Sequence, residues 1–368
     1  MNASACARAQ LSAKAYLKQA LAWRKTMPFC RGSSSELNEP GRYSCPADLL
    51  ELGFESCSSI APINASDFVG THAGKSIVLF GDSLLRQLFY ELLCQLGGTV
   101  VDADLSSPVY KWARLVAHGI PALMLSFVYQ QLLGHNATTG RADFDDPLTL
   151  RSDARHALTL ASTVVFNAGA FASGFDQLAG SIDEFASFVR RLDVKVHARH
   201  QSGRGAHKHQ VERQPSPQLQ MRRLLFVEYM APHFASRGGD YTKHNGWGFG
   251  LKTGVRYGCK PGSPAAFLAS DAAYRWTRTS QHVRSLGVRL VPAFELTMLA
   301  WRQHSFHSLA SRGVQDCRHW CAPSPILEAQ TRLLVTHLLR SARDEHEAPS
   351  GGLRVGPRTG VWRRERDT

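Results

Sequence analysis

From about residue 70 onwards, short apolar runs alternate with segments of helical periodicity. The run at 76–80 is apolar and β-favouring, and the leucines at 84, 85, 88, 92 and 93 that follow it recur at helical spacing. Further strands are expected at 162–166, 224–228 and 288–292, and further helices near 175–192 and over 265–286. Short buried strands separated by helices predict an α/β fold, in which a mostly parallel sheet carries helices on both faces.

Three segments of the chain do not follow this alternation. Residues 1–70 contain cysteines and many turn-forming residues without a regular period, and they are interpreted as a loop-rich N-terminal collar stapled by disulfides. Residues 195–223 carry seven Lys or Arg and one Glu, and are expected to form a flexible basic insertion. Residues 342–368 are polar and Arg-rich, which predicts a disordered tail. The α/β domain is therefore expected over 71–341.

Composition narrows the class of protein. Hydrophobic residues make up 43% of the 368 positions and charged residues 20%, values typical of a globular chain. The net charge of +13 suggests nucleic-acid binding by itself, but no DNA- or RNA-binding motif accompanies it, so no nucleic-acid partner is expected. A basic surface could equally attract acidic polysaccharide. The longest apolar stretches, 121–133 and 325–339, are too short to cross a bilayer, so no membrane anchor is expected in this chain.

The cysteines and glycosylation sequons favour an oxidising compartment. The chain has eight cysteines without a CxxC pair, and sequons begin at Asn2, Asn64 and Asn136. Against this, the first 30 residues lack the apolar core of a signal peptide. Either the protein stays in a reducing compartment or this start is incomplete, and we favour the second interpretation. The oligomeric state is not predicted.

A serine follows the first predicted strand directly. Gly81, Asp82 and Ser83 would form the turn between that strand and the next helix, where ligands bind in open parallel sheets. Unpaired N–H groups at the start of the helix could donate to the oxyanion of a tetrahedral intermediate. The alternative interpretation is that Ser83 is simply a helix N-cap.

A serine nucleophile needs a base, and the segment from Asp316 to Cys321 offers one. Asp316 and His319 are three residues apart, so on one loop or helical turn they could converge, with the carboxylate orienting the imidazole toward Ser83. Cysteines at 317 and 321 and a tryptophan at 320 surround the pair. The alternative is an ordinary surface loop held by disulfides.

Together these two motifs resemble the trichome birefringence-like (PC-esterase) branch of the SGNH/GDSL hydrolase superfamily, whose hallmarks are GDSxxR and DxxH, commonly as DCxHWC. Weaker similarities lie between them at 126–129, 164–169 and 231–234. The resemblance implies an SGNH-like three-layer α/β/α sandwich that adds acyl groups, usually acetyl, to glycan hydroxyls or removes them.

By this resemblance Ser83 is the nucleophile, His319 the general base and Asp316 its orienting partner. Asn167 and Gly169 match the block that supplies oxyanion or substrate contacts, although Asn167 could instead form a simple strand-end turn. Arg86 shares a helix face with Ser83 and could stabilise the oxyanion or position the site; otherwise it is a solvated helix charge.

The resemblance also implies a function and a set of partners. We expect a serine-dependent O-acyltransferase whose acceptor is a polysaccharide or glycan and whose co-substrate is acetyl-CoA or another acyl carrier. The expected location is the Golgi lumen or the cell exterior. The alternatives are an O-acetyl esterase of the same fold and a non-catalytic glycan-binding protein. No tightly bound cofactor is expected, and no metal, because the scattered histidines lack ligand spacing.

Further details of the site follow from the resemblance. Cys259 is expected to pair with Cys317, and Cys321 with a cysteine of the collar. Trp247, Trp301 and Trp320 could form sugar-stacking walls, or could pack in the core. Ala168 stands where the family has Thr, and residues 170–171 replace its usual aromatic pair, so the acceptor cleft is expected to differ in shape.

Overall fold

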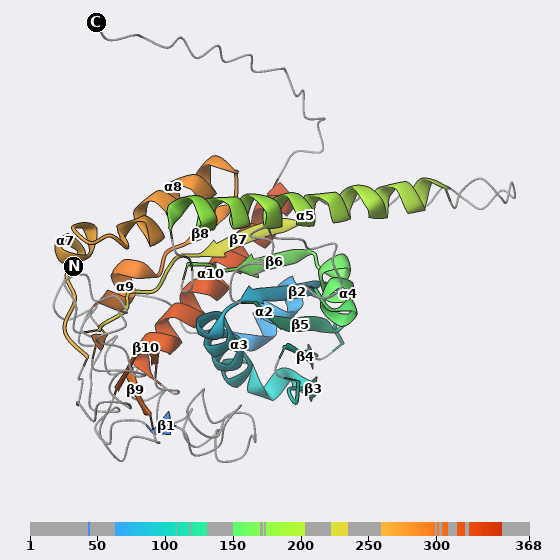
Figure 1. The fold of residues 1–368 in the computed structure, drawn as a ribbon. Coiled ribbons are helices and arrows are strands. Elements are labelled where there is room, and N and C mark those ends of the chain that lie inside the picture. The colour runs from blue at the N-terminus through green and yellow to red at the C-terminus, as the bar shows by residue number, and fades with distance from the viewer. Residues whose placement is uncertain are drawn as a thin grey trace, which may run out of the picture.

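The computed structural model describes residues 43–44, 63–130, 150–202, 222–234, 259–307, 315–320 and 324–347, apart from 108, 118, 170, 171, 173, 299, 302 and 303. Its centre is a seven-stranded sheet of order β3-β4-β5-β2-β6-β7-β8 (Figure 1). The strands are β2 (Ser76–Gly81), β3 (Val100–Asp104), β4 (Tyr110–Leu115), β5 (Leu123–Tyr129), β6 (Thr163–Phe166), β7 (Arg223–Val227) and β8 (Arg289–Val291).

Five neighbouring strands of this sheet, from β5 to β8, run parallel, and β3 and β4 add an antiparallel edge. The sequence predicted a mostly parallel sheet, and this is confirmed. Strands β2, β6, β7 and β8 lie where the apolar runs placed them, within one or two residues. Strands β3 and β4 were not predicted.

Helices cover both faces of the sheet (Figure 1). They are α2 (Ala65–Thr71), α3 (Ser83–Gln95), α4 (Ser152–Leu160), α5 (Phe175–Ser202), α7 (Pro264–Leu268), α8 (Thr277–Ser285), α9 (Phe294–Met298) and α10 (Pro325–Glu347), with the short 3-10 turns η2 (Gly97–Thr99) and η4 (Ala273–Arg275). Among these helices, none is both long and apolar enough to cross a membrane.

The side chains of β2 show why both faces of the sheet must be covered. Ile77 and Leu79 enter the core cluster that α2, α3 and α10 complete, whereas Val78 and Phe80 enter the cluster completed by α4, α5 and α8. All four are fully buried. Successive side chains of a strand point to opposite faces, so a central strand between two helical layers must be apolar throughout. Burying each such side chain contributes roughly 1.5–3 kcal/mol.

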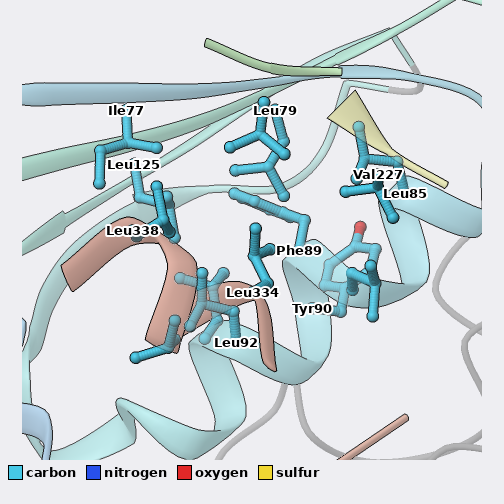
Figure 2. Close-up of a cluster of buried hydrophobic side chains, with 14 of the residues drawn as sticks. Ile77, Leu79, Leu85, Phe89, Tyr90, Leu92, Leu125, Val227, Leu334 and Leu338 are labelled. Carbon is cyan, nitrogen blue, oxygen red and sulfur yellow. The ribbon is translucent and has the colours of Figure 1, made fainter. Parts of the chain in front are cut away.

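The first of these clusters positions helix α3, which begins at Ser83. Figure 2 shows Leu85, Phe89 and Leu92 of α3 packed between the sheet and α10, which contributes Leu334 and Leu338. These residues recur at the helical spacing seen in the sequence. The start of α3 is therefore fixed against the sheet by its own buried face.

A second, smaller sheet lies beside the main one. It joins β1 (Tyr43–Ser44), β9 (His304–His307) and β10 (Gln315–Trp320) in antiparallel order β1-β9-β10. Between the pairs Gln315↔Phe306 and Trp320↔His304 the register shifts, so β10 holds more residues than the partner segment. Such a bulge bends a strand and redirects its side chains.

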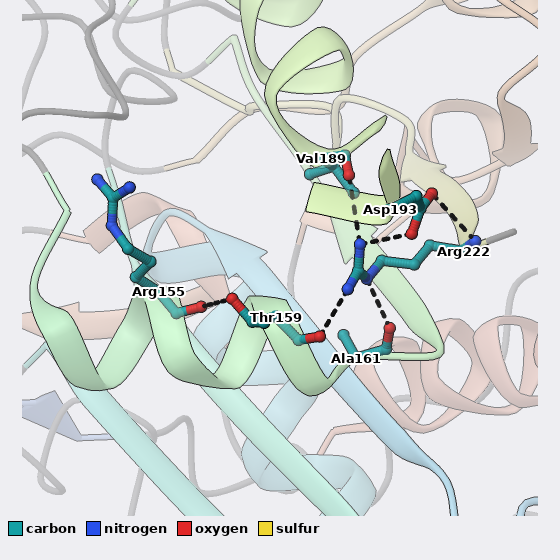
Figure 3. A network of polar contacts seen from close by, with 6 residues as sticks. All are labelled: Arg155, Thr159, Ala161, Val189, Asp193 and Arg222. Carbon is teal, nitrogen blue, oxygen red and sulfur yellow. Dashed lines mark hydrogen bonds and ion pairs between the residues drawn. The ribbon is translucent and has the colours of Figure 1, made fainter. Parts of the chain in front are cut away.

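Arg222 anchors the C-terminal end of the basic segment. Its guanidinium forms an ion pair with Asp193 of α5 and donates to the carbonyl oxygens of Thr159 (2.6 Å) and Ala161 (2.9 Å), as Figure 3 shows. Helix α5 continues to Ser202, beyond the end predicted near residue 192. The flexible insertion predicted over 195–223 therefore begins within a helix and ends in β7, and 203–221 lie outside the described residues.

Other predicted boundaries also move. The collar was placed at 1–70, but α2 begins at Ala65 and buries Phe68 and Val69 in the main core, so the α/β body starts earlier. Apart from 43–44, the collar before residue 63 lies outside the described residues. The tail was placed at 342–368, yet α10 extends to Glu347 and Ala342 is fully buried.

The single helix predicted over 265–286 is wrong. This stretch forms α7, η4 and α8 in succession. The hydroxyl of Ser270 donates to the carbonyl of Phe267 at 2.6 Å and ends α7, because such a side-chain bond competes with helical pairing. Trp276 then stacks on Phe294 with ring centroids 4.0 Å apart, and its Nε1 donates to Glu228. Tertiary packing of this tryptophan sets the break.

Candidate active site

Ser83 is the first residue of α3, at the carboxyl end of the central strand β2. Asp82, and not Ser83, is the N-cap: its Oδ1 accepts from the N–H of Leu84 at 2.9 Å. The interpretation of Ser83 as a simple cap is therefore wrong. Its hydroxyl remains available for another partner, at the end of the sheet where ligands bind in open α/β folds.

That partner is His319. Its Nε2 lies 2.7 Å from Ser83 Oγ, across 236 residues of sequence. His319 belongs to β10, within the bulged part of the strand, and not to the loop or helical turn that the sequence suggested. An imidazole nitrogen at this distance can take the serine proton, which is the geometry that serine nucleophiles require.

A reciprocal pair of hydrogen bonds fixes the turn that carries Ser83. Asn167, which follows β6, accepts from the N–H of Asp82 at 3.0 Å through Oδ1, and its Nδ2 donates to Asp82 Oδ1 at 2.8 Å. All these groups are buried. A Cβ at Gly81 would overlap Asn167 Oδ1, so only glycine fits beneath this amide. Asn167 thus positions the serine turn, and its second Nδ2 hydrogen is not used by Asp82.

A second clamp holds the strand of His319 against helix α3. The Gln87 side chain, one turn after Ser83, donates through Nε2 to the Trp320 carbonyl at 2.9 Å and accepts from the Trp320 N–H at 3.1 Å. Gln87 is 3% exposed. Because Trp320 follows His319 directly, these bonds fix His319 relative to Ser83. Gln87 was not predicted from the sequence, although its place four residues after Ser83 puts both side chains on one helix face.

Gly169 and Arg86 lie at the same end of the sheet. Gly169 has φ 119°, in a region that favours glycine, two residues after Asn167. The Arg86 guanidinium lies over the ring of Tyr129, 5.2 Å from its centroid, at the end of β5. Arg86 is half-buried. It is therefore held against an aromatic ring, and is not the solvated helix charge considered as its alternative.

Two further titratable groups beside Arg86 are withdrawn from solvent. Lys111 is 1% exposed, and its Nζ donates to the carbonyl oxygens of Leu105, at 2.7 Å, and Ser107. Burial, with a smaller effect of Arg86, lowers the pKa of Lys111 to about 8. Burial raises the pKa of Tyr90 to about 12, and Arg86 opposes this rise. Lys111 is thus engaged by the loop before β4.

The remaining predicted residues lie partly outside the described part of the chain. Asp316 lies in β10 three residues before His319, but its side chain is outside the described residues, and so are Cys321 and Trp247. Trp320 is fully buried and stacks on His304, so it is a core residue and not a sugar-stacking wall. Trp301 packs against the cluster of Phe234, Cys259 and Cys317.

The disulfide between Cys259 and Cys317 is confirmed. It ties the segment before α7 to β10, two residues before His319, and both cysteines are buried. Cys94, near the end of α3, is also disulfide-bonded, to a partner outside the described residues. No role for Cys94 was predicted from the sequence.

The arrangement provides a hydroxyl, a base at hydrogen-bonding distance, and clamps that fix both. Among the described residues, no group of three or more His, Cys, Asp or Glu side chains could hold a metal ion. Comparison with models of known protein families and with curated proteins finds no match to this chain.

Proposed function

We propose that this chain is a serine-dependent O-acyltransferase of the SGNH type, similar to the trichome birefringence-like branch, which transfers acyl groups, most simply acetyl, to glycan hydroxyls. The observation that carries the proposal is the 2.7 Å contact between Ser83 Oγ and His319 Nε2 at the carboxyl end of the central strand. The sheet with helices on both faces and the two sequence motifs support it.

The first half of the reaction forms an acyl-serine. His319 Nε2 takes the proton of Ser83 as Oγ attacks the acyl carbonyl carbon of the donor. When the tetrahedral intermediate collapses, the bond to the donor's leaving group breaks, and His319 returns the proton to that group. Asp316, three residues before His319 in the bulged strand, is proposed to orient the imidazole.

The negative oxygen of the intermediate needs donors. The N–H of Ser83 at the start of α3, the N–H of Gly169 and the second Nδ2 hydrogen of Asn167 are proposed for this role. Arg86, held over Tyr129, adds positive charge at the same end of the sheet. Each pre-positioned donor of this kind contributes on the order of 3 kcal/mol to catalysis.

The second half releases the acyl group to an acceptor. His319 takes the proton of a sugar hydroxyl, whose oxygen attacks the acyl carbon, and the Ser83–acyl bond breaks as Oγ regains a proton. If water replaces the sugar, the same site is an O-acetyl esterase. The donor is proposed to be acetyl-CoA or another acyl carrier, and the compartment one that maintains the Cys259–Cys317 disulfide, such as the Golgi lumen or the cell exterior.

The test is transfer from an activated acetyl ester to a panel of glycans, with release of free acetate measured in parallel. We expect Ser83→Ala and His319→Ala each to lower turnover by about a thousandfold or more. Matched controls are Ser285→Ala and His156→Ala, because both residues are exposed on other helices. Acetylated glycan identifies a transferase, and acetate alone identifies an esterase.

The opposite result is equally clear. If wild-type protein with an intact thermal transition neither acetylates a glycan nor releases acetate above the Ser83→Ala level, the enzymatic proposal is wrong. Retention of glycans by both proteins would then favour the non-catalytic binding role.

A further inference from the structure

Two buried histidines in contact with each other lie next to the main chain of His319, the candidate base. His233, in the segment after β7, and His304, the first residue of β9, are both 0% exposed. Their ring nitrogens, His233 Nδ1 and His304 Nε2, are 2.7 Å apart. The other nitrogens meet main-chain carbonyls: His233 Nε2 lies 3.0 Å from Met298 O, and His304 Nδ1 lies 3.0 Å from His319 O. The pair thus forms a chain that ends on the peptide group of His319.

When both rings are neutral, the three contacts of the histidine pair need one more hydrogen than the two rings carry. A carbonyl oxygen only accepts, so each of the two carbonyl contacts needs a hydrogen on the ring nitrogen. The contact between the rings needs one more. Three hydrogens are required, whereas two neutral imidazoles carry two. A single added proton satisfies all three contacts at once.

We propose that His304 is a positioning residue for His319, and that the His233–His304 pair completes its three hydrogen bonds by sharing one added proton. The catalytic part of this inference rests on the proposed function, because it takes His319 as the base. The hydrogen count rests only on the contacts of the pair.

The surroundings of the pair hold its rings in place. His304 stacks on Trp320, with centroids 4.0 Å apart and an angle of 17° between planes. The His233 N–H donates to the carbonyl of Cys317 at 2.9 Å, and the His233 carbonyl accepts from the N–H of Lys260 at 2.9 Å. The main chain of His233 is therefore fixed between β10 and the segment before α7, and the ring of His304 is fixed against Trp320.

Charged and titratable groups lie on the elements that contact the pair, and Glu295, exposed on α9, is one of them. His319 and Arg318 lie on β10, the Arg318 guanidinium being over Phe234, and the exposed Lys260 side chain lies before α7. Burial lowers the pKa of His233 to about 4, and the Met298 carbonyl partly opposes this. While both rings are neutral, two arrangements keep a hydrogen bond between them.

The two neutral arrangements differ at His319. In one, His233 donates to His304 Nε2 and His304 donates to the His319 carbonyl. In the other, His233 donates to Met298 and His304 donates back to His233, which leaves His304 Nδ1 without a hydrogen toward His319. Proton uptake below neutral pH removes the second arrangement. The hydrogen bond from His304 Nδ1 to the His319 carbonyl therefore depends on the protonation of the pair.

The direct test follows the pair in the full-length protein labelled with ¹⁵N-histidine and with ¹³C at the His319 carbonyl, titrated from pH 8 to pH 3. We expect His233 and His304 together to take up one proton, with a midpoint below the ordinary histidine value, and the His319 carbonyl signal to move with the same midpoint. Two independent histidines taking up one proton each, or a carbonyl signal that does not follow the pair, would overturn the inference. This readout needs no catalysis, so it stands even if the proposed function fails.

Variants at the pair test the positioning role by the rate at which a fluorophosphonate labels Ser83 at pH 8. The Asn amide nitrogen occupies the place of His Nδ1, so His304→Asn keeps the donor to His319, whereas His304→Phe keeps the stack on Trp320 without the donor. We expect His304→Phe to label about tenfold more slowly or worse, because small displacements of a base are costly, and His304→Asn to stay near wild type.

A third variant tests the hydrogen count. His233→Asn places an N–H group opposite His304 Nε2, which keeps the hydrogen of His304 on Nδ1. We expect it to label at the wild-type rate or faster and to abolish the shared proton uptake. Equal labelling by His304→Asn and His304→Phe, at equal thermal midpoints, would contradict a positioning role. If His304→Phe does not fold, the titration of the wild-type protein decides.

Discussion

Gly81 lies beneath the amide of Asn167, where a Cβ would overlap Asn167 Oδ1. We expect Gly81→Ala to displace Asn167 from Asp82 and to move the Ser83 turn, lowering turnover about a hundredfold. Stability should fall by about 1–3 kcal/mol, since a buried amide loses its partners. Steady-state kinetics and urea unfolding measure both effects.

Gly180→Ala is the matched control for this substitution. Gly180 is exposed in α5, and a Cβ there meets no atom within 4 Å. Alanine should therefore raise stability by about 0.5–1 kcal/mol and leave turnover unchanged. Wild-type turnover in Gly81→Ala would show that the Asn167–Asp82 clamp does not set the position of the serine.

The residues of the site differ in how far the sequence revealed them. Ser83 and His319 were predicted because their motifs have side chains whose chemistry is recognisable from type and spacing. Gln87 and His304 were not predicted, because both contact main-chain groups of β10. Every residue has a peptide group, so such a contact cannot be recognised from the type of the partner residue. Asn167 was predicted as an oxyanion donor, and its bonds to Asp82 appear only when β2 and β6 are side by side.

At the scale of elements, Gln87 joins α3 to β10 by two hydrogen bonds to Trp320. We expect Gln87→Ala to lower kcat about 10- to 100-fold with little change in KM, because the base loses its alignment while the acceptor surface remains. The buried Trp320 peptide would also lose its partners, at a cost of about 1–3 kcal/mol.

Gln281→Ala, on the exposed surface of α8, is the control for Gln87→Ala. A Gln87→Ala protein with unchanged kcat and raised KM would mean that Gln87 serves acceptor binding. That outcome would remove it from the positioning of His319.

The disulfide between Cys259 and Cys317 also restrains strand β10, which carries His319. It closes a loop with a sequence separation of 58. By loop entropy, replacing both cysteines with alanine should destabilise the fold by about 4 kcal/mol, measured by urea unfolding. A loss below about 1 kcal/mol would show that the loop is already restrained in the unfolded chain.

The elements were predictable where burial is uniform. Strands β2 and β6 are apolar on both faces because helices cover both, so a continuous apolar run marks them. Strand β4 does not show a clear alternation of apolar and polar residues in its sequence. Its buried positions are Lys111, Ala113 and Leu115, and the buried lysine, which donates to carbonyl oxygens, breaks the apolar pattern. Strand β3 is an exposed edge with two aspartates, which do not favour a strand.

At the scale of the whole molecule, His72 makes stability depend on pH. It is 0% exposed, and neither ring nitrogen has a hydrogen-bond partner among the described residues. Burial, together with Arg223 and Lys75, lowers its pKa to about 3. The unfolded chain binds the proton below the ordinary pKa of 6.5 and the folded chain does not, so stability should fall as pH drops from about 6.5 toward 3.

The measurement is the free energy of unfolding in urea at several pH values. One such histidine contributes a slope of at most about 1.4 kcal/mol per pH unit in this window. We expect His72→Phe to reduce the slope by that amount and to raise stability at acid pH. An unchanged slope would mean that His72 gains a partner or solvent access that its surroundings do not indicate.

Ser83 is proposed to be a nucleophile that His319 activates, and the contact between their side chains supports this. The most direct measurement is the intact mass of the oxidised, folded protein after a fluorophosphonate, for wild type, Ser83→Ala, His319→Ala and the control Ser285→Ala. We expect one adduct in wild type and Ser285→Ala, none in Ser83→Ala, and strongly slowed labelling in His319→Ala. An adduct that persists in Ser83→Ala, or its absence from folded wild-type protein, would contradict the claim.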